Sequence, residues 1–325
     1  NSSSVNGSAM TQTGNNFSNV TVTGATAIAG WSNTEGASSS SGPTKTITGN
    51  TFSNITGGSS AITALAVNFG NATVCTGNMI TNITGSGAIT GLTHGTSNQG
   101  VQTYSNNTVT SLISNGTGGN VTGITGGATT VTTMNINNNT INTLSSTGAS
   151  STVTGLAVTA GAIVNAGGNV IHTLSGSGAT SPLVRGLSVS SGTTVNVTKN
   201  KIYNLSETGA ISTTTSAVNG FLFSGGTTVT ASNNLIGDLR APAASLTDAI
   251  RGISITSTTA STTFNIFHNT VNINATSTGT NFGTTALFHT FSTTATSAAL
   301  NLRNNILLNN SAPNGTGLTV AFRRS

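Results

Sequence analysis

The sequence predicts an all-β protein folded as a parallel β-helix, a coil in which every turn contributes the same short strands. Three observations predict this fold. An asparagine recurs at a nearly constant interval, short segments of alternating apolar residues keep fixed positions relative to it, and Gly, Ser and Asn separate those segments. A repeat of roughly 20 to 50 residues is typical of solenoids and related arrays.

The recurring asparagine defines the period. It stands two residues before a core-type side chain in ten places, and neighbouring copies lie 28 to 36 residues apart, with a mean of about 32. The ten copies are Asn15, Asn50, Asn78, Asn107, Asn139, Asn169, Asn200, Asn234, Asn269 and Asn305. A side-chain amide both donates and accepts hydrogen bonds, so we expect the copies to form an interior ladder from turn to turn. Asparagine also tolerates the left-handed backbone of tight corners, which is a second reason to place it there.

Each period contains three segments that are typical of strands. One begins just after the asparagine, and one precedes the next asparagine, as Val195 and Val197 precede Asn200. The middle segments are Ile62–Leu65, Ile89–Leu92, Val121–Ile124, Val153–Leu156, Val184–Leu187, Val218–Phe221 and Ile250–Ile253. Such short strands bury their apolar side only if equivalent strands of successive turns pair in parallel. The prediction is therefore a β-solenoid of about ten turns.

The repeat continues to the last residue without a linker, so residues 1–325 are predicted to form a single domain. Residues 1–14 precede the first ladder asparagine and are predicted to be an irregular N-terminal turn. Pro182, Pro242 and Pro313 lie in the variable connections between the first two strands of a turn, where no paired N–H is needed. We expect both ends to lack a capping segment and to be covered by further repeats or by another copy of the chain.

Composition argues against several classes of function. Charged residues are 4% of the chain, and the net charge of +5 comes from basic residues scattered over many turns, so we expect no nucleic-acid partner. No apolar run has the length of a membrane helix, so we expect no membrane insertion. The single cysteine, Cys75, takes a core position of the repeat, allows no internal disulfide and has no partners for a metal site.

Two arginines are the candidate ligand contacts. Arg185 and Arg251 occupy the same outward position in turns six and eight, with Asn219 at that position in the turn between them. Two interpretations stay open at this stage. The pair forms a surface ligand site, or both side chains are solvated surface arginines without a function.

The acidic and histidine residues give no catalytic constellation. The acids are Glu35, Glu207, Asp238 and Asp248. Polysaccharide cleavage needs clustered carboxylates, and Glu207 with Asp238 is the pair closest in the repeat, but isolated loop acids are the simpler interpretation. The histidines His94, His172, His268 and His289 are spread over several turns, and His94 takes a core or corner position. We therefore expect no enzyme activity, no catalytic residues, no metal and no cofactor.

The Asn-x-Ile/Val corner, the Gly-Leu-x-Val strand and the Thr-Val-x-Val strand resemble the right-handed parallel β-helix repeat proteins of bacterial surfaces, especially exported Thr/Ser/Asn/Gly-rich adhesins and filament proteins. The resemblance covers residues 10–325. It implies a secreted, extracellular protein with a structural or adhesive role, such as a segment of a surface fibre, sheath or adhesin stalk. The implied partners are further copies or repeats of itself and surface glycans. A carbohydrate-binding or polysaccharide-cleaving β-helix protein is the alternative.

Overall fold

The computed structural model describes residues 9–33, 42–95, 97–178, 180, 182–213, 216–291 and 299–325. Throughout these residues the chain is built from β-strands, with no helix. The strands form three sheets in which every described neighbour pair within a sheet is parallel. The predicted parallel β-solenoid is confirmed.

Each turn contributes one strand position to each sheet. Sheet 1 contains β1 (Met10–Thr13), β4 (Thr44–Thr48), β7 (Ala72–Thr76), β10 (Gly100–Ser105), β13 (Val131–Asn137), β16 (Ile163–Gly167), β19 (Thr194–Thr198), β22 (Thr228–Ser232), β26 (Thr263–Phe267) and β29 (Ala299–Arg303). Sheet 2 contains β2 (Asn16–Thr21), β5 (Thr51–Thr56), β8 (Met79–Gly85), β11 (Thr108–Ser114), β14 (Thr140–Ser146), β17 (Val170–Gly176), β20 (Lys201–Glu207), β23 (Leu235–Gly237), β24 (Leu239–Arg240), β27 (Thr270–Ile273) and β30 (Ile306–Asn309). Sheet 3 contains β3 (Ile28–Ser32), β6 (Ile62–Val67), β9 (Ile89–His94), β12 (Val121–Gly126), β15 (Thr152–Val158), β18 (Leu183–Val189), β21 (Val218–Phe223), β25 (Leu246–Ile255), β28 (Phe282–His289) and β31 (Thr319–Arg324).

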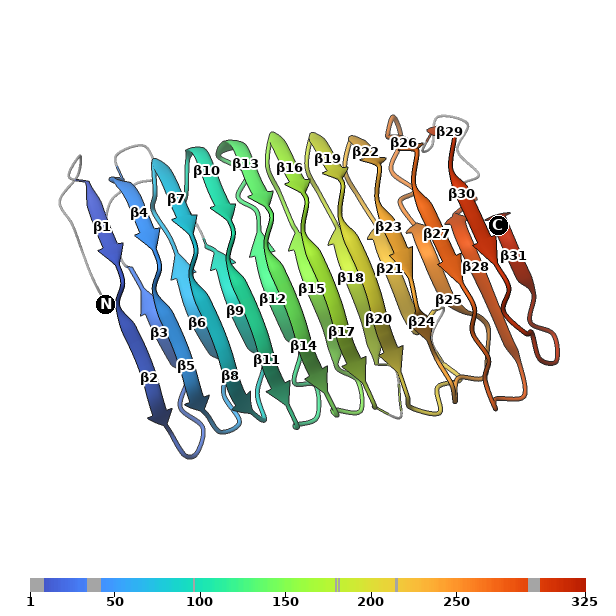
Figure 1. The fold of residues 1–325 in the computed structure, drawn as a ribbon, viewed down its shortest axis with the longest axis horizontal. Coiled ribbons are helices and arrows are strands. Elements are labelled where there is room, and N and C mark those ends of the chain that lie inside the picture. The colour runs from blue at the N-terminus through green and yellow to red at the C-terminus, as the bar shows by residue number, and fades with distance from the viewer. Residues whose placement is uncertain are drawn as a thin grey trace.

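The coil advances steadily from one end of the molecule to the other (Figure 1). Sheet 1 has ten strands, so its rungs are separated by nine turn-to-turn intervals. In Figure 1 the nearer strands run downward while the chain advances to the right, and the fainter strands of sheet 3 return upward, which makes the coil right-handed. Residues 10–13, predicted to lie in an irregular N-terminal turn, instead form β1, because Met10 to Thr13 pair in register with Lys45 to Thr48.

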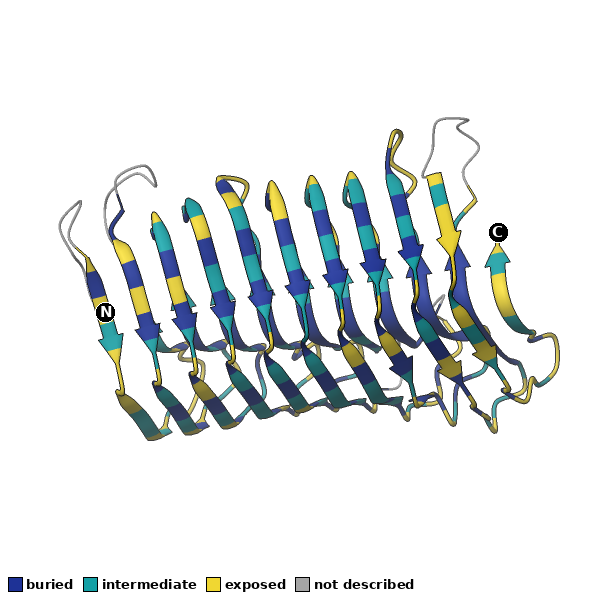
Figure 2. Cartoon of the chain, turned by 45° about the horizontal axis from the view of Figure 1, so that its top comes forward, coloured by how far each residue is buried: buried dark blue, intermediate teal, exposed yellow. Residues whose placement is uncertain are grey.

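The core consists of columns of inward side chains that repeat from turn to turn. One column of sheet 2 includes Phe52, Ile80, Val109 and Ile141, and each is at most 4% exposed. Buried and less buried residues alternate along the strands of the middle turns (Figure 2). Cys75 lies fully buried in a sheet 1 column, as predicted, and burial raises the pKa of its thiol.

The asparagine ladder is continuous over nine steps from Asn15 to Asn305. Asn169 shows the pattern: its backbone N–H and its Nδ2 donate to Asn200 Oδ1 at 3.0 and 2.9 Å. Nδ2 also donates to the Ile136 carbonyl at 2.8 Å. The copies from Asn50 to Asn269 are at most 2% exposed. The ladder therefore satisfies backbone and side-chain groups that water does not reach.

The left-handed corner is formed by the residue before each ladder asparagine, not by the asparagine itself. These ten residues have φ between 52° and 66°, and they are Gly14, Gly49, Gly77, Asn106, Asn138, Gly168, Lys199, Asn233, His268 and Asn304. The expectation that the ladder asparagine itself adopts the left-handed backbone of the corner is therefore wrong. Their side chains are selected by the hydrogen bonds of the ladder, and Gly or Asn at the preceding position relieves the backbone strain.

Candidate functional site

The two candidate arginines lie where the repeat predicts. Arg185 on β18 is in register with Asn219 on β21, and Asn219 is in register with Arg251 on β25. Arg251 is 7% exposed, so it is not a solvated surface side chain, whereas Arg185 is half-buried. The interpretation as a solvated surface residue is therefore wrong for Arg251, and for Arg185 it stays open.

Arg251 is held by several contacts at once. Its Nε donates to Asp248 Oδ2 at 2.8 Å, and its Nη1 donates to Ser254 Oγ at 3.3 Å. Its guanidinium carbon lies 3.5 Å from the centre of the Phe288 ring. Burial lowers the pKa of Arg251, and the neighbouring carboxylate of Asp248 opposes this shift. These contacts fix the guanidinium in one orientation on the outer face of sheet 3.

Asp248 reaches this position because β25 is irregular. Its register shifts between Leu246 and Ile250, so extra residues lie opposite β28. The bulge brings the Asp248 carboxylate to Thr285, whose Oγ1 donates to Oδ1 at 2.7 Å. Arg323 Nη1 lies 4.0 Å from Asp248 Oδ2. One buried carboxylate is therefore shared between two arginines.

Among the described residues, Arg185 has no such carboxylate partner. None of their acceptors bonds to its buried Nε, and burial lowers the pKa of its guanidinium. Asn219 next to it exchanges hydrogen bonds with Ser216 at 3.1 and 3.3 Å. An arginine without a carboxylate can accept an anion from outside the protein at little cost to the fold.

A groove connects the two arginines across sheet 3. It has a volume of about 350 Å³ and is lined by hydroxyl, amide and aliphatic side chains as well as both guanidinium groups. We call it the arginine groove, and its lining residues are Leu183, Arg185, Ser216, Asn219, Leu222, Ser224, Arg251, Ser254 and Thr256. A second hollow of about 310 Å³ adjoins it at Arg251 and contains Asp248, Phe288 and Arg323.

The acids considered for catalysis do not meet. Asp238 occupies a left-handed position between β23 and β24, with φ of 51°, and its exposed carboxylate pairs with Arg240 at the protein surface. Glu207 is not a loop acid, as the sequence suggested, because it ends β20 and is 0% exposed. Its Oε1 accepts from the Gly209 N–H at 2.9 Å, and no described residue donates to its Oε2. Glu35 lies outside the described residues.

Glu207 is expected to make stability depend on pH. Burial raises the pKa of its carboxyl from 4.5 to about 7, although hydrogen bonds from the Gly209 and Thr208 backbone oppose the shift. Folding therefore favours the protonated form. The contribution of this group to stability is fully present below pH 4.5 and is lost as the pH rises to about 7. The free energy of unfolding of the unchanged protein should therefore fall by roughly 1–3 kcal/mol between pH 4.5 and about 7. Glu207→Gln should abolish this fall, as measured by denaturant unfolding at several pH values. Asp238→Asn is the control, and an equal effect of both substitutions would contradict the prediction.

The histidines are also separate from one another. His94 is 3% exposed, in register with Val67, and its ring packs edge-on against Tyr104 with centroids 5.4 Å apart, so its predicted core position is confirmed. Burial lowers the pKa of His94 to about 4. His172 stacks on Tyr203, with ring centroids 4.8 Å apart. In the part of the chain that the structure describes, no group of three His, Cys, Asp or Glu side chains is close enough to hold a metal ion.

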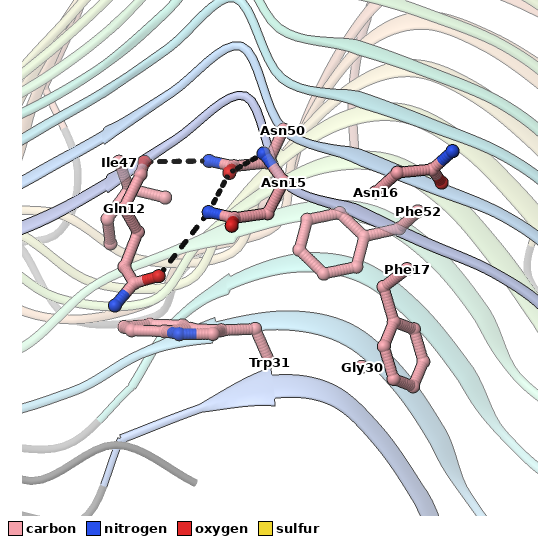
Figure 3. Close-up of a pocket in the computed structure, with 9 residues that line it drawn as sticks. All are labelled: Gln12, Asn15, Asn16, Phe17, Gly30, Trp31, Ile47, Asn50 and Phe52. Atoms are coloured by element: carbon pink, nitrogen blue, oxygen red, sulfur yellow. Dashed lines mark hydrogen bonds between the residues drawn. The ribbon is translucent and has the colours of Figure 1, made fainter.

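A further hollow lies at the N-terminal end of the coil. Its volume is about 220 Å³, and Figure 3 shows the Trp31 ring on one side of it and the Phe17 ring on another. The Asn15 amide borders the hollow, where its Nδ2 donates to Asn50 Oδ1 at 2.9 Å.

Within the described ranges, no helix is long and apolar enough to cross a membrane. Comparison of the chain with protein-family models, with curated proteins and with solved structures found no match.

Proposed function

We propose that this chain is an extracellular structural protein, a β-solenoid segment of a surface fibre, sheath or adhesin stalk that stacks end to end. The observation that carries the proposal is the complementarity of the two end faces of the coil. At one end the ladder presents an acceptor, and at the other it presents donors.

The N-terminal face presents the acceptor. Within the ladder each Oδ1 accepts from the residue one turn earlier, but no hydrogen bond from the described residues reaches Asn15 Oδ1. The inward side chains of this turn, including Phe17 and Trp31, are half-buried and border the hollow in Figure 3. Another coil placed on this face would bury these rings.

The C-terminal face presents the donors. The Asn305 Nδ2 donates to the Ile266 carbonyl at 2.7 Å, but among the described residues no next-turn Oδ1 accepts from its backbone N–H. The inward columns end here in apolar side chains, with Leu302 37% and Phe322 43% exposed. Edge strands of this kind are templates for further pairing. A coil from the same longer chain or from a second copy would continue both the ladder and the sheets, and stacking of unlike faces propagates into a filament.

The outer surface supports an extracellular structural role. Sheet 1 carries a second, outward ladder of asparagines, in which Asn196 Nδ2 donates to Asn165 Oδ1 at 2.9 Å and Asn165 Nδ2 donates to Asn135 Oδ1 at 2.9 Å. With charged residues at 4% of the chain, solubility comes mainly from such neutral polar groups. We propose no catalytic role, no cofactor and no nucleic-acid partner, since the acidic and histidine side chains described above are dispersed or occupied in structural contacts.

Sedimentation tests the stacking. We expect the purified chain to form species larger than 32.0 kDa that increase with protein concentration and appear as uniform fibres by electron microscopy. Leu302→Asp places a charge on the C-terminal face and should prevent this association. Ile113→Asp is the matched control, because Ile113 is also exposed, at 39%, but lies on β11 in the middle of the coil. A monomer at high concentration, or equal loss of association in both variants, would refute end-to-end stacking of this chain.

Carbohydrate binding is the second candidate function, and the arginine groove favours it. Polysaccharide cleavage has less support, because Glu207 lies inside the coil and Asp248 is bonded to Arg251 and Thr285. We therefore retain the binding function and not the cleaving one.

A further inference from the structure

We propose that the arginine groove binds carboxylates of an acidic polysaccharide whose chain lies along the solenoid axis, across turns six to eight. The proposal rests on the arrangement of Arg185, Asn219 and Arg251 in one column. It does not depend on end-to-end stacking, because the groove lies on the side of the coil.

The charge in this region is unbalanced. Arg251 and Arg323 share one carboxylate, that of Asp248, which bonds to Arg251 and lies 4.0 Å from Arg323. In the part of the chain that the structure describes, Arg185 has no carboxylate partner, and its buried Nε lacks an acceptor. Arg185 as a whole is half-buried and lines the groove, so an oxyanion bound there would supply the counter-charge that its guanidinium lacks.

The spacing of the charges suits a linear polymer. The strands that carry Arg185 and Arg251 lie two strand spacings, or about 9.6 Å, apart along the axis. Asn219, whose amide is bonded to Ser216, lies between them and adds no charge to the column. Alternate carboxylates of a linear polyuronate can therefore meet the two guanidinium groups in turn. A single small anion could bond to only one of them in this orientation.

The rest of the lining favours sugars over nucleic acid. Ser224, Ser254 and Thr256 supply hydroxyl groups along the groove, and Leu222 supplies an aliphatic surface. The Phe288 ring, in the adjoining hollow, already carries the Arg251 guanidinium on its face. Single-stranded nucleic acid binding uses aromatic platforms for the bases together with a dense basic track, and the lining of this groove offers neither.

Polygalacturonate is the probe for the experiment, and its fully methyl-esterified form is the neutral comparison. We expect affinity electrophoresis at low salt to show retardation by polygalacturonate and none by the ester. Arg185→Gln should weaken binding by about 10-fold, the effect of one charge-assisted contact. This substitution leaves Arg251, Asp248 and Ser254 in place, so the fold should persist. Arg185→Lys should give an intermediate affinity, because it retains the charge but loses the planar fork.

Arg240→Gln is the control, since it removes the same charge from an exposed side chain on sheet 2. Unchanged affinity in this variant supports a specific site, and an equal loss in both variants would attribute binding to general charge and overturn the proposal. No retardation by polygalacturonate, or equal retardation by its ester, would also overturn it. Galacturonic acid monomer binding as tightly as the polymer would refute the use of both arginines. Leu302→Asp should bind polygalacturonate normally, which separates this result from the outcome of the stacking test.

Discussion

Replacing Asn169 by alanine is expected to lower the free energy of unfolding by about 3 kcal/mol. The substitution removes the acceptor of the Asn139 N–H and Nδ2, both bonded at 3.0 Å, and the donor to the Ile136 carbonyl. These groups are inside the coil, where Asn169 is 0% exposed and water cannot replace its amide. A buried group left without a partner costs about 1–3 kcal/mol, and this change leaves several. Denaturant unfolding measures the loss.

Asn196 provides the matched control. It also belongs to a ladder of amides and bonds to Asn165 at 2.9 Å, but it points outward from sheet 1 and is only half-buried. Asn196→Ala should cost less than about 1 kcal/mol, because solvent replaces the lost hydrogen bonds. Hydrogen exchange should show faster opening around the Asn169 corner in the first variant only. Equal losses of stability in the two variants would contradict the interior role of the ladder.

Asp248→Ala is expected to have an effect of about 3–5 kcal/mol, as is found when one partner of a buried ion pair is removed. The carboxylate accepts from Arg251 Nε at 2.8 Å and from Thr285 Oγ1 at 2.7 Å. Its loss leaves the Arg251 guanidinium, 7% exposed, without a counter-charge. The free energy of unfolding, measured at neutral pH, should fall accordingly.

The chain contains a second aspartate–arginine pair for comparison. Asp238 pairs with Arg240 at the surface, where the side chains are 44% and 52% exposed. Asp238→Ala should therefore cost less than about 1 kcal/mol. Equal losses of unfolding free energy in Asp248→Ala and Asp238→Ala would show that burial does not strengthen the Asp248–Arg251 ion pair, and would contradict the prediction.

Two features of the site have signals in the sequence. The seventh residue after the ladder asparagine is Ser114, Ser146 and Gly176 in three successive turns, and Glu207 in the next. A carboxylate in a column of small residues was a signal that Glu207 points inward. The Asp248-x-x-Arg251 spacing was likewise visible, but it joins two side chains only if the strand between them is irregular.

The sequence by itself determined the repeat, the three strands of each turn, the parallel register and the asparagine ladder. It could do so because identical positions of a stacked coil must superimpose, so that the pattern of one turn constrains the next. Only the tertiary structure decided that the residue before each ladder asparagine, Lys199 or His268 included, forms the left-handed corner. It also decided that Arg251 is buried and that Arg185 has no carboxylate among the described residues. The burial of Arg251 depends on how turns of unequal length pack against each other, as at the bulge in β25, and no single repeat encodes that packing.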